Sequence, residues 1–178
     1  MNKLQFYARS ADMPAGSGVG DCVEDPSIYA KLNKIPNWRR MFSSLWDGEN
    51  ILYKGRTYKS FEHAFQAQKF IHAGYNKIAY SFCLESGTIL SEGTGLDAFK
   101  ARKKKLLSEE QMGSWHSIVS DIKMDLYRTK YGKGTIARKA LLYTKTAELW
   151  NAGPRIRKVR CFSTELIRDE ILKSRQTR

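Results

Sequence analysis

The segment from Tyr58 to Phe70 carries the densest group of side chains in this chain that could do chemistry. If the segment is helical, Glu62, Gln66 and Lys69 lie at i, i+4 and i+7, which places a carboxylate, an amide and an amine on one face. A carboxylate in the first turn of a helix is stabilised as an anion, so Glu62 could support a developing oxocarbenium ion or orient a water molecule. The same spacing is typical of a surface glutamate with a polar neighbour, and spacing alone does not separate the two interpretations.

The apolar pattern predicts the elements that must position these side chains. Apolar residues recur three and four apart from Phe61 to Ile71, which predicts a helix with an N-cap at Ser60 and an end near Gly74. The preceding segment, 51–58, has two short β-prone runs joined by a Lys-Gly pair and predicts a hairpin.

The rest of the chain is predicted to be mainly helical. A strand-like run opens it at 4–9, and the Gly- and Pro-rich segment 11–26 is expected to be a mobile surface loop, because it lacks the motifs of known nucleotide-binding loops. Further helices are expected over 77–86, 96–105, 108–131, 135–143 and 163–174. We find no repeat and no long linker, and therefore expect an α+β fold: a mostly helical single domain, residues 1–178, with a few short strands.

Charge is the most unusual feature of the composition. The chain has 178 residues, of which 31 are basic and 18 acidic, giving a formal net charge of +13. The basic excess is concentrated in Lys100–Lys105 and from Lys130 to the C-terminus. Such a charge suggests an anionic partner, with nucleic acid among the candidates, although a solvated surface that aids solubility is the alternative for either cluster.

Other classes of protein are disfavoured. No window approaches the roughly 18 apolar residues of a membrane helix, and the first residues offer no signal-peptide core, so we expect a cytoplasmic protein with no membrane partner. The three cysteines, Cys22, Cys83 and Cys161, form no C-x-x-C pair, and the three histidines have no ligand spacing with them. We therefore expect no disulfide framework, no metal site and no cofactor.

Several motifs in the same order resemble the NADAR (YbiA-like) family. That signature runs roughly L/F-S-N-F/W, a hairpin, then S-x-E-H-x-[FY]-Q-A-x-K, and it matches Met41–Trp46 and Tyr58–Phe70. Ser44 stands where the family commonly has Asn. The likeness covers nearly the whole chain, and it continues through Gly93–Lys103, Trp115, Lys130-Tyr131, Ala147–Trp150, Arg155 and Arg160.

The resemblance implies hydrolysis of an N-glycosidic bond between ribose C1′ and an exocyclic base amine. Described members act on ADP-ribose attached to guanine, or on a ribosylamino pyrimidine phosphate of riboflavin synthesis; the charge favours the first, and the second is the alternative. The partner expected is a phosphorylated riboside or ADP-ribosyl substrate, while the oligomeric state is left open. A non-catalytic module that binds ADP-ribose or nucleic acid is the rival from another class.

The resemblance also suggests roles for residues. Glu62 becomes the acid/base catalyst, and Lys69 could form a Schiff base with the opened sugar, bind phosphate, or pair with Glu62. His63 is expected to be a packed or hydrogen-bonded residue beside them. Substrate-binding candidates are aromatic side chains that could stack on a base or pack in the core, cations for the diphosphate, and the motif serine. They are Trp115, Trp46, Trp150, Arg102, Lys130, Arg155 and Ser44.

Overall fold

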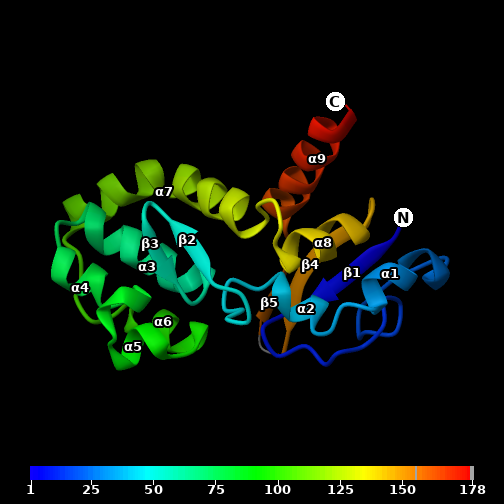
Figure 1. Cartoon of the computed structure of the whole chain (residues 1–178), viewed down its shortest axis with the longest axis horizontal. Coiled ribbons are helices and arrows are strands. Elements are labelled where there is room, and N and C mark those ends of the chain that lie inside the picture. The colour runs from blue at the N-terminus through cyan, green and yellow to red at the C-terminus, as the bar shows by residue number, and fades with distance from the viewer. Residues whose placement is uncertain (155, 177–178) are drawn as a thin grey trace. The chain divides into compact units, whose positions relative to one another are not determined.

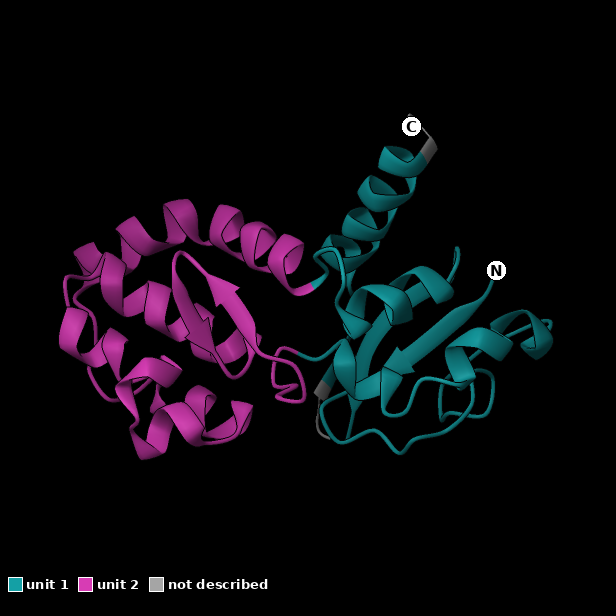
Figure 2. Ribbon diagram, in the orientation of Figure 1, with its two compact units in different colours: residues 1–43, 131–178 teal, residues 44–130 magenta. Residues whose placement is uncertain are grey.

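The computed structural model describes residues 1–154 and 156–176 of the chain (Figure 1). It has the mostly helical α+β architecture expected from the sequence. The chain divides into two compact units (Figure 2). The central unit is Ser44–Lys130, and the terminal unit combines Met1–Ser43 with Tyr131–Arg178.

The central unit is a group of helices packed around one of their number, together with a two-stranded sheet. Its elements in chain order are β2 (Ile51–Tyr53), β3 (Arg56–Tyr58), α3 (Phe61–His72), α4 (Asn76–Tyr80), the 3-10 helix η2 (Leu84–Ser86), α5 (Ile89–Glu92), α6 (Gly95–Ala101) and α7 (Glu109–Lys130). Helix α3 contacts α4, α6 and α7, so it forms the centre of this unit.

Local sequence explains why α3 begins and ends where it does. The Ser60 side chain accepts a hydrogen bond from the His63 backbone N–H, as expected of an N-cap. After His72 the chain turns at Gly74, whose φ of +82° is readily adopted by glycine. The predicted helix and its cap are therefore confirmed, and its buried face packs in a core with side chains from the hairpin, α4, α6 and α7.

The predicted hairpin is also confirmed. Strands β2 and β3 are antiparallel, with Ile51 opposite Tyr58 and Tyr53 opposite Arg56. Lys54 and Gly55 between them both have positive φ, +48° and +77°, as a two-residue turn with the right-handed twist of the strands requires. The hairpin leads directly into the N-cap of α3 and so anchors the start of that helix.

The terminal unit contains a three-stranded sheet with helices around it. Its elements are β1 (Lys3–Phe6), the 3-10 helix η1 (Pro26–Tyr29), α1 (Ala30–Asn33), α2 (Trp38–Met41), α8 (Ile136–Tyr143), β4 (Glu148–Gly153), β5 (Ile156–Arg160) and α9 (Phe162–Gln176). The strand order is β1-β4-β5; β1 runs parallel to β4, and β5 runs antiparallel to it. Leu4 and Phe6 of β1 face the core, while Lys3 and Gln5 occupy the opposite face.

The Gly-rich segment 11–26 is organised by one buried ion pair in the terminal unit. Asp21 accepts hydrogen bonds from the backbone N–H groups of Gln5, Gly16 and Gly18, at 2.8, 2.9 and 3.2 Å. The Arg39 guanidinium, from α2, lies on the same carboxylate with Nη2 2.6 Å from Oδ2. The loop expected to be mobile therefore has a folded centre, whose backbone donors are turned toward a carboxylate of the chain itself.

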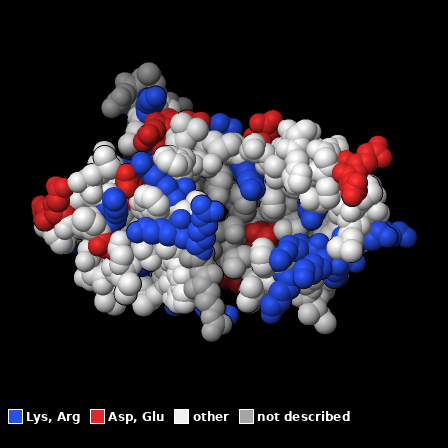
Figure 3. Space-filling model, turned by 180° about the vertical axis from the view of Figure 1, so that it is seen from behind, with Lys and Arg blue, Asp and Glu red and all other residues white. Residues whose placement is uncertain are grey.

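In the space-filling view of Figure 3, basic side chains gather in several patches, and acidic side chains are fewer. This distribution accords with the large positive charge of the sequence. Within residues 1–154 and 156–176, no helix combines the length and apolar character needed to cross a bilayer.

Candidate functional site

Glu62 lies in the first turn of α3 and is almost completely buried, with 6% of its surface exposed. Its backbone N–H donates to the carbonyl oxygen of Ser44 over 3.0 Å, which ties the start of the helix to the 41–46 motif. Its Oε1 accepts a hydrogen bond of 2.8 Å from Gln66 Nε2, one turn along the helix. The carboxylate is therefore oriented by protein groups in a low-dielectric setting.

Opposing effects act on the pKa of Glu62. Burial is the largest and raises the pKa above its usual value. Hydrogen bonds from the side chains of Gln66 and Ser44, and the positive charges of Arg102 and Lys123, lower the pKa but do not cancel the effect of burial. A carboxyl group whose pKa is raised holds its proton closer to neutral pH, which suits it to act as a general acid.

This raised pKa makes a prediction about stability. The folded protein binds the Glu62 proton more tightly than the unfolded chain, whose carboxyl has the ordinary value of 4.5. Stability is thus fully retained below the unfolded pKa and is lost as pH rises through the folded pKa. We expect the free energy of unfolding to fall, relative to Glu62→Gln, as pH rises above about 4.5 toward neutrality; urea titrations of both proteins across this range measure it. A difference that does not change with pH would contradict the burial effect.

Lys69 is a half-buried amine two turns after Glu62 on α3. Burial lowers its pKa, and the nearby charge of Arg102 lowers it further. Within the described part of the chain, Lys69 forms no ion pair and no side-chain hydrogen bond. The alternative in which Lys69 simply pairs with Glu62 therefore has no support in this geometry, and a larger neutral fraction of the amine favours nucleophilic chemistry.

Arg102 follows α6 and acts electrostatically on both Glu62 and Lys69 of α3. Its positive charge lowers the pKa of each. The guanidinium lies 3.6 Å from the centroid of the Phe99 ring and donates from Nη1 to the Phe99 carbonyl. Arg102 thus keeps a fixed position at the end of its helix and supplies a positive charge beside the candidate acid.

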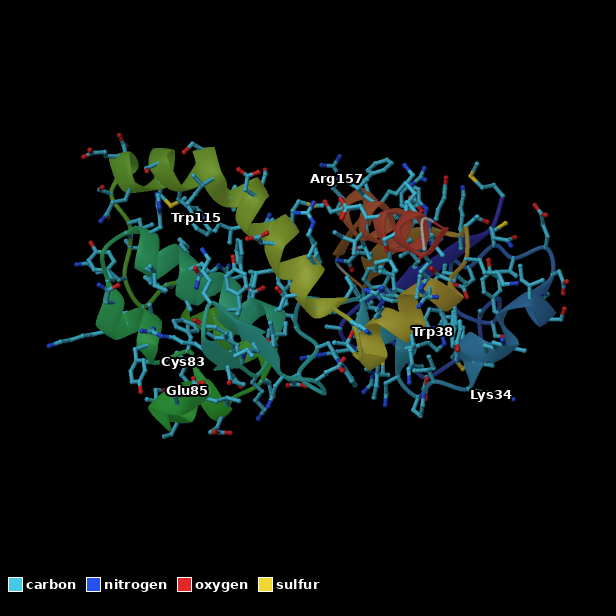
Figure 4. All side chains as sticks on the ribbon, turned by 45° about the horizontal axis from the view of Figure 1, so that its top comes forward. Lys34, Trp38, Cys83, Glu85, Trp115 and Arg157 are labelled. Carbon is cyan, nitrogen blue, oxygen red and sulfur yellow. The ribbon has the colours of Figure 1, made fainter. Side chains whose placement is uncertain are left out.

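Trp115 lies on α7 and points toward α3 (Figure 4). Only 3% of it is exposed, and its ring packs against Phe65 and His72, with centroid distances of 5.5 and 5.9 Å. The Lys123 ammonium lies 5.4 Å from the centroid of Phe65. In this position Trp115 supports the half-buried Phe65 and has little ring surface of its own to offer a base.

The 44–46 segment meets α6 at very short range. At Gly95, the first residue of α6, a Cβ would lie 2.3 Å from the Leu45 carbonyl oxygen, so only glycine fits. The Trp46 ring is half-buried and lies directly over Gly48, where a Cβ would come within 2.1 Å of the ring. The Leu45 backbone, next to the Ser44 carbonyl that bonds Glu62, therefore packs closely against the start of α6.

Lys130, the last residue of α7, is a buried amine with 5% exposure. Burial lowers its pKa to about 7, against the opposing effect of the Glu49 charge. Its environment is therefore quite unlike that of the exposed lysines of the 100–105 run. An amine with this pKa is a weaker cation at neutral pH than the phosphate-binding role assumes.

Two binding candidates belong to the terminal unit. Trp150 lies on β4; its indole N–H donates to Glu148 Oε2 over 2.9 Å, and the ammonium groups of Lys3 and Lys158 lie 5.9 and 5.2 Å from its ring. Arg155 lies outside the described residues. The structure thus brings together, within the central unit, the candidates Glu62, Lys69, Ser44 and Arg102.

His63 is fully buried and held at both ring nitrogens. Nε2 lies 3.0 Å from the Leu90 carbonyl oxygen and donates to it, while Nδ1 lies 2.8 Å from the Ser60 hydroxyl. Burial lowers its pKa, so the neutral ring persists. The histidine therefore connects the N-cap of α3 to α5.

Two residues at the site were not among the sequence-predicted binding or catalytic residues. Gln66 was placed on the same face but given no role, and the structure makes it the hydrogen-bond donor to Glu62. Lys123 acts on the Glu62 charge from α7. The sequence could have indicated Lys123 by its position about two helical turns after Trp115, which places it on the side of α7 that meets α3.

Among residues 1–154 and 156–176, no group of three or more His, Cys, Asp or Glu side chains could hold a metal ion. The candidate site thus consists of a buried carboxyl, an amide, two amines and a guanidinium. These groups can transfer protons, form an imine and neutralise anions.

Comparisons with known proteins show a likeness in fold. No family model matches the chain, and no curated protein matches it. The structure is similar to the NMR structure of the E. coli protein YbiA, with a TM-score of 0.57 and 16% sequence identity, over 98% of this chain and 88% of that chain. This chain therefore has the YbiA-like α+β fold that its sequence motifs predicted.

Proposed function

We propose that this protein is an N-glycosidase that hydrolyses the bond between ribose C1′ and an exocyclic base amine, with ADP-ribose on guanine as its substrate. The observation that carries the proposal is the setting of Glu62: a buried carboxyl of raised pKa, oriented by Gln66 and Ser44, on the same helix as an amine of lowered pKa. Such oppositely shifted pairs of groups are typical of acid-base and nucleophilic sites.

The chemistry that these groups support begins with opening of the sugar ring. The lone pair of the exocyclic nitrogen forms a C1′=N bond, the C1′–O4′ bond breaks, and O4′ takes the Glu62 proton. An ordinary nucleoside, whose ring nitrogen has its lone pair in the aromatic system, opens far less readily. The general acid is therefore used for a step that only a glycosylamine offers.

In the second step, Lys69 acts as the nucleophile. Its neutral amine adds to C1′, the base amine leaves with a proton, and an imine between Lys69 and C1′ remains, which water hydrolyses to release the sugar and restore the lysine. Glu62, now ionised, accepts a proton from that water. The lowered pKa of Lys69 supports this role because only the unprotonated amine is a nucleophile.

Charge favours an anionic substrate of dinucleotide or nucleic-acid type. Arg102 and Lys123 both act on Glu62, and the chain as a whole carries +13. These cations suit phosphate groups near the sugar, and the overall charge suits association with a polyanion.

Substrate choice is tested by incubating the protein with ADP-ribosylated guanine DNA and, separately, with the ribosylamino pyrimidine phosphate. Release of guanine-containing DNA, with little turnover of the pyrimidine, is the expected result. Turnover of the pyrimidine alone would replace the substrate but keep the chemistry. Binding of ADP-ribose without turnover of either would favour the non-catalytic module.

The covalent step makes a separate prediction. Borohydride added during turnover should reduce the imine and leave one sugar permanently attached to Lys69, which peptide mass spectrometry detects. Lys69→Arg keeps a positive charge but should give no adduct. Lys77→Arg, a change at an exposed lysine of α4, serves as the matched control and should be labelled like the parent protein. An adduct that persists in Lys69→Arg would assign the nucleophile to another amine.

A further inference from the structure

The terminal unit contains a cavity to which the chemistry above gives no role. It has a volume of about 620 Å³ and lies among β1, the Gly-rich loop and the end of β4. This volume is within the range of roughly 300–1,000 Å³ that small-molecule sites occupy. None of the described residues that line it is among the catalytic candidates.

The cavity occupies a place in the sheet where ligands commonly bind. Strands β1 and β4 are parallel and lie side by side (Figure 1), and the cavity is lined by Tyr7 and Ser10 just beyond β1 and by Gly153 and Pro154 where β4 ends. Both strands thus present their carboxyl ends to it, which is the edge of a parallel sheet that usually carries the ligand.

At two glycines of the wall, neighbouring side chains pack directly against the backbone. A Cβ on Gly153 would lie 2.7 Å from the Tyr7 ring, and a Cβ on Gly18 would lie 2.7 Å from the Arg39 guanidinium. The strand pairing of β4 is irregular between residues 151 and 153, and there the Ala152 carbonyl accepts a hydrogen bond from the Gln5 side chain. Such irregularities are frequent at binding sites, because they redirect side chains and free backbone groups.

Among the described residues that line the cavity, the charged side chain is Arg39, and its charge is already neutralised. Each of the five N–H groups of Arg39 donates within the chain: to Asp21 twice, and to the carbonyl oxygens of Gln5, Met13 and Pro14. The loop N–H groups of Gly16 and Gly18 bond Asp21, in the place where a phosphate-binding loop would hold its anion. The cavity therefore offers a phosphate neither a spare guanidinium donor nor these amides.

What remains available is an aromatic ring, apolar contacts and one exposed hydroxyl group. The Tyr7 ring, the half-exposed Met13 side chain and the exposed Val19 side chain supply the apolar wall, and Ser17 supplies the hydroxyl. The Ser10 hydroxyl is buried and accepts a hydrogen bond from the Tyr7 backbone N–H. A flat heteroaromatic ring with a hydrogen-bonding edge matches this combination, whereas an aliphatic chain would make no hydrogen bond to the Ser17 hydroxyl.

We propose that this cavity is a binding site for an uncharged nucleobase, presented as a nucleoside, and that it does not recognise phosphate. The site is distinct from the catalytic candidates and its test reads binding alone, so the result is independent of whether the proposed hydrolysis occurs.

The test follows the amide resonances of the ¹⁵N-labelled full-length protein during titration with guanosine and, separately, with guanosine monophosphate. Guanosine should shift the amides of Gly18, Val19 and Gly153, and the monophosphate should bind no more tightly. Tyr7→Ala should weaken guanosine about tenfold, the size of one lost stacking contact. Tyr143→Ala removes a tyrosine of α8 in the same unit that does not line the cavity, and should leave the affinity unchanged.

A second variant guards against a folding defect in Tyr7→Ala. Val19 is 92% exposed, so Val19→Asp should leave the fold intact while it replaces an apolar wall by a charge, and guanosine should bind several-fold more weakly. The proposal is overturned if the monophosphate binds at least tenfold more tightly than guanosine, if no nucleoside shifts these amides, or if both variants bind guanosine as the parent does.

Discussion

Replacing Glu62 by glutamine should reduce turnover of the glycosylamine substrate by about a thousandfold, within the roughly 10²–10⁴-fold contribution of general acid-base catalysis. The amide has the shape of the carboxyl group but cannot give a proton to O4′ during ring opening. Because Glu62→Gln also removes a buried ionisable group of raised pKa, its free energy of unfolding at neutral pH should stay level or rise. Single-turnover kinetics and urea unfolding measure the two effects on the same sample.

The combination of lost activity with unimpaired stability is what distinguishes a catalyst from a structural residue. Glu92→Gln, a change at an exposed glutamate of α5, is the matched control and should leave turnover within about twofold of the parent, since surface substitutions rarely matter. Unchanged turnover in Glu62→Gln, with ligand affinity kept, would remove Glu62 from the mechanism. Loss of activity together with a large loss of stability would instead indicate a packing role.

Replacing Arg39 by methionine should cause the largest loss of stability in the terminal unit. Arg39 is 2% exposed and binds a fully buried carboxylate, Asp21. Removing one partner of a buried ion pair typically costs about 3–5 kcal/mol, because the other charge stays buried without compensation. The carbonyl oxygens of Met13 and Pro14 in the loop, and of Gln5 in β1, lose their donor as well. Hydrogen exchange at the β1 and β4 amides, together with urea unfolding, measures the effect in this unit.

Arg40→Met provides the comparison for this loss. Arg40 is adjacent and half-buried, and its Nε donates to the Ser10 carbonyl oxygen, so its removal should cost only about 0.5–1.5 kcal/mol. Adding Asp21→Asn to Arg39→Met should restore part of the stability, since it removes the stranded negative charge. Equal losses in Arg39→Met and Arg40→Met would show that the buried pair has no special role.

Elements with a local cause could be predicted from the sequence. The Lys54-Gly55 turn and the Ser60 cap depend on residues within a few positions of each other, and both were confirmed. The long helix expected over 108–131 is α7, Glu109–Lys130. Helix α6 is shorter than the expected 96–105 and ends at Ala101, where a run of like charges follows and disfavours further helical turns.

Elements whose cause is distant were missed. Strand β4 pairs in parallel with β1 from the opposite end of the chain, so its residues show no local hairpin signal. The short helices α1 and α2 likewise gave too few turns for a period to be recognised. The order in the Gly-rich loop depends on Asp21 meeting Arg39, a pairing that no local pattern reveals.

The candidate site likewise has features that the sequence predicted and features that depend on tertiary packing. Helical spacing placed Glu62, Gln66 and Lys69 on one face, but it could not show that the carboxyl is buried or that Gln66 bonds it. Lys123 of α7 and Arg102, the residue after α6, act electrostatically on Glu62. Which cations lie near the acid is therefore a property of the packing between α3, α6 and α7.

The contact of Gly95 with the Leu45 carbonyl extends the site to a residue with no functional group. Any side chain there would displace the Leu45 backbone, and with it the neighbouring Ser44 carbonyl that accepts the hydrogen bond from the Glu62 backbone N–H. The lack of a Cβ at Gly95 thus helps to fix the backbone that bonds Glu62. In the proposed mechanism, a side chain at Gly95 would change proton donation by Glu62 although it replaces no ionisable group.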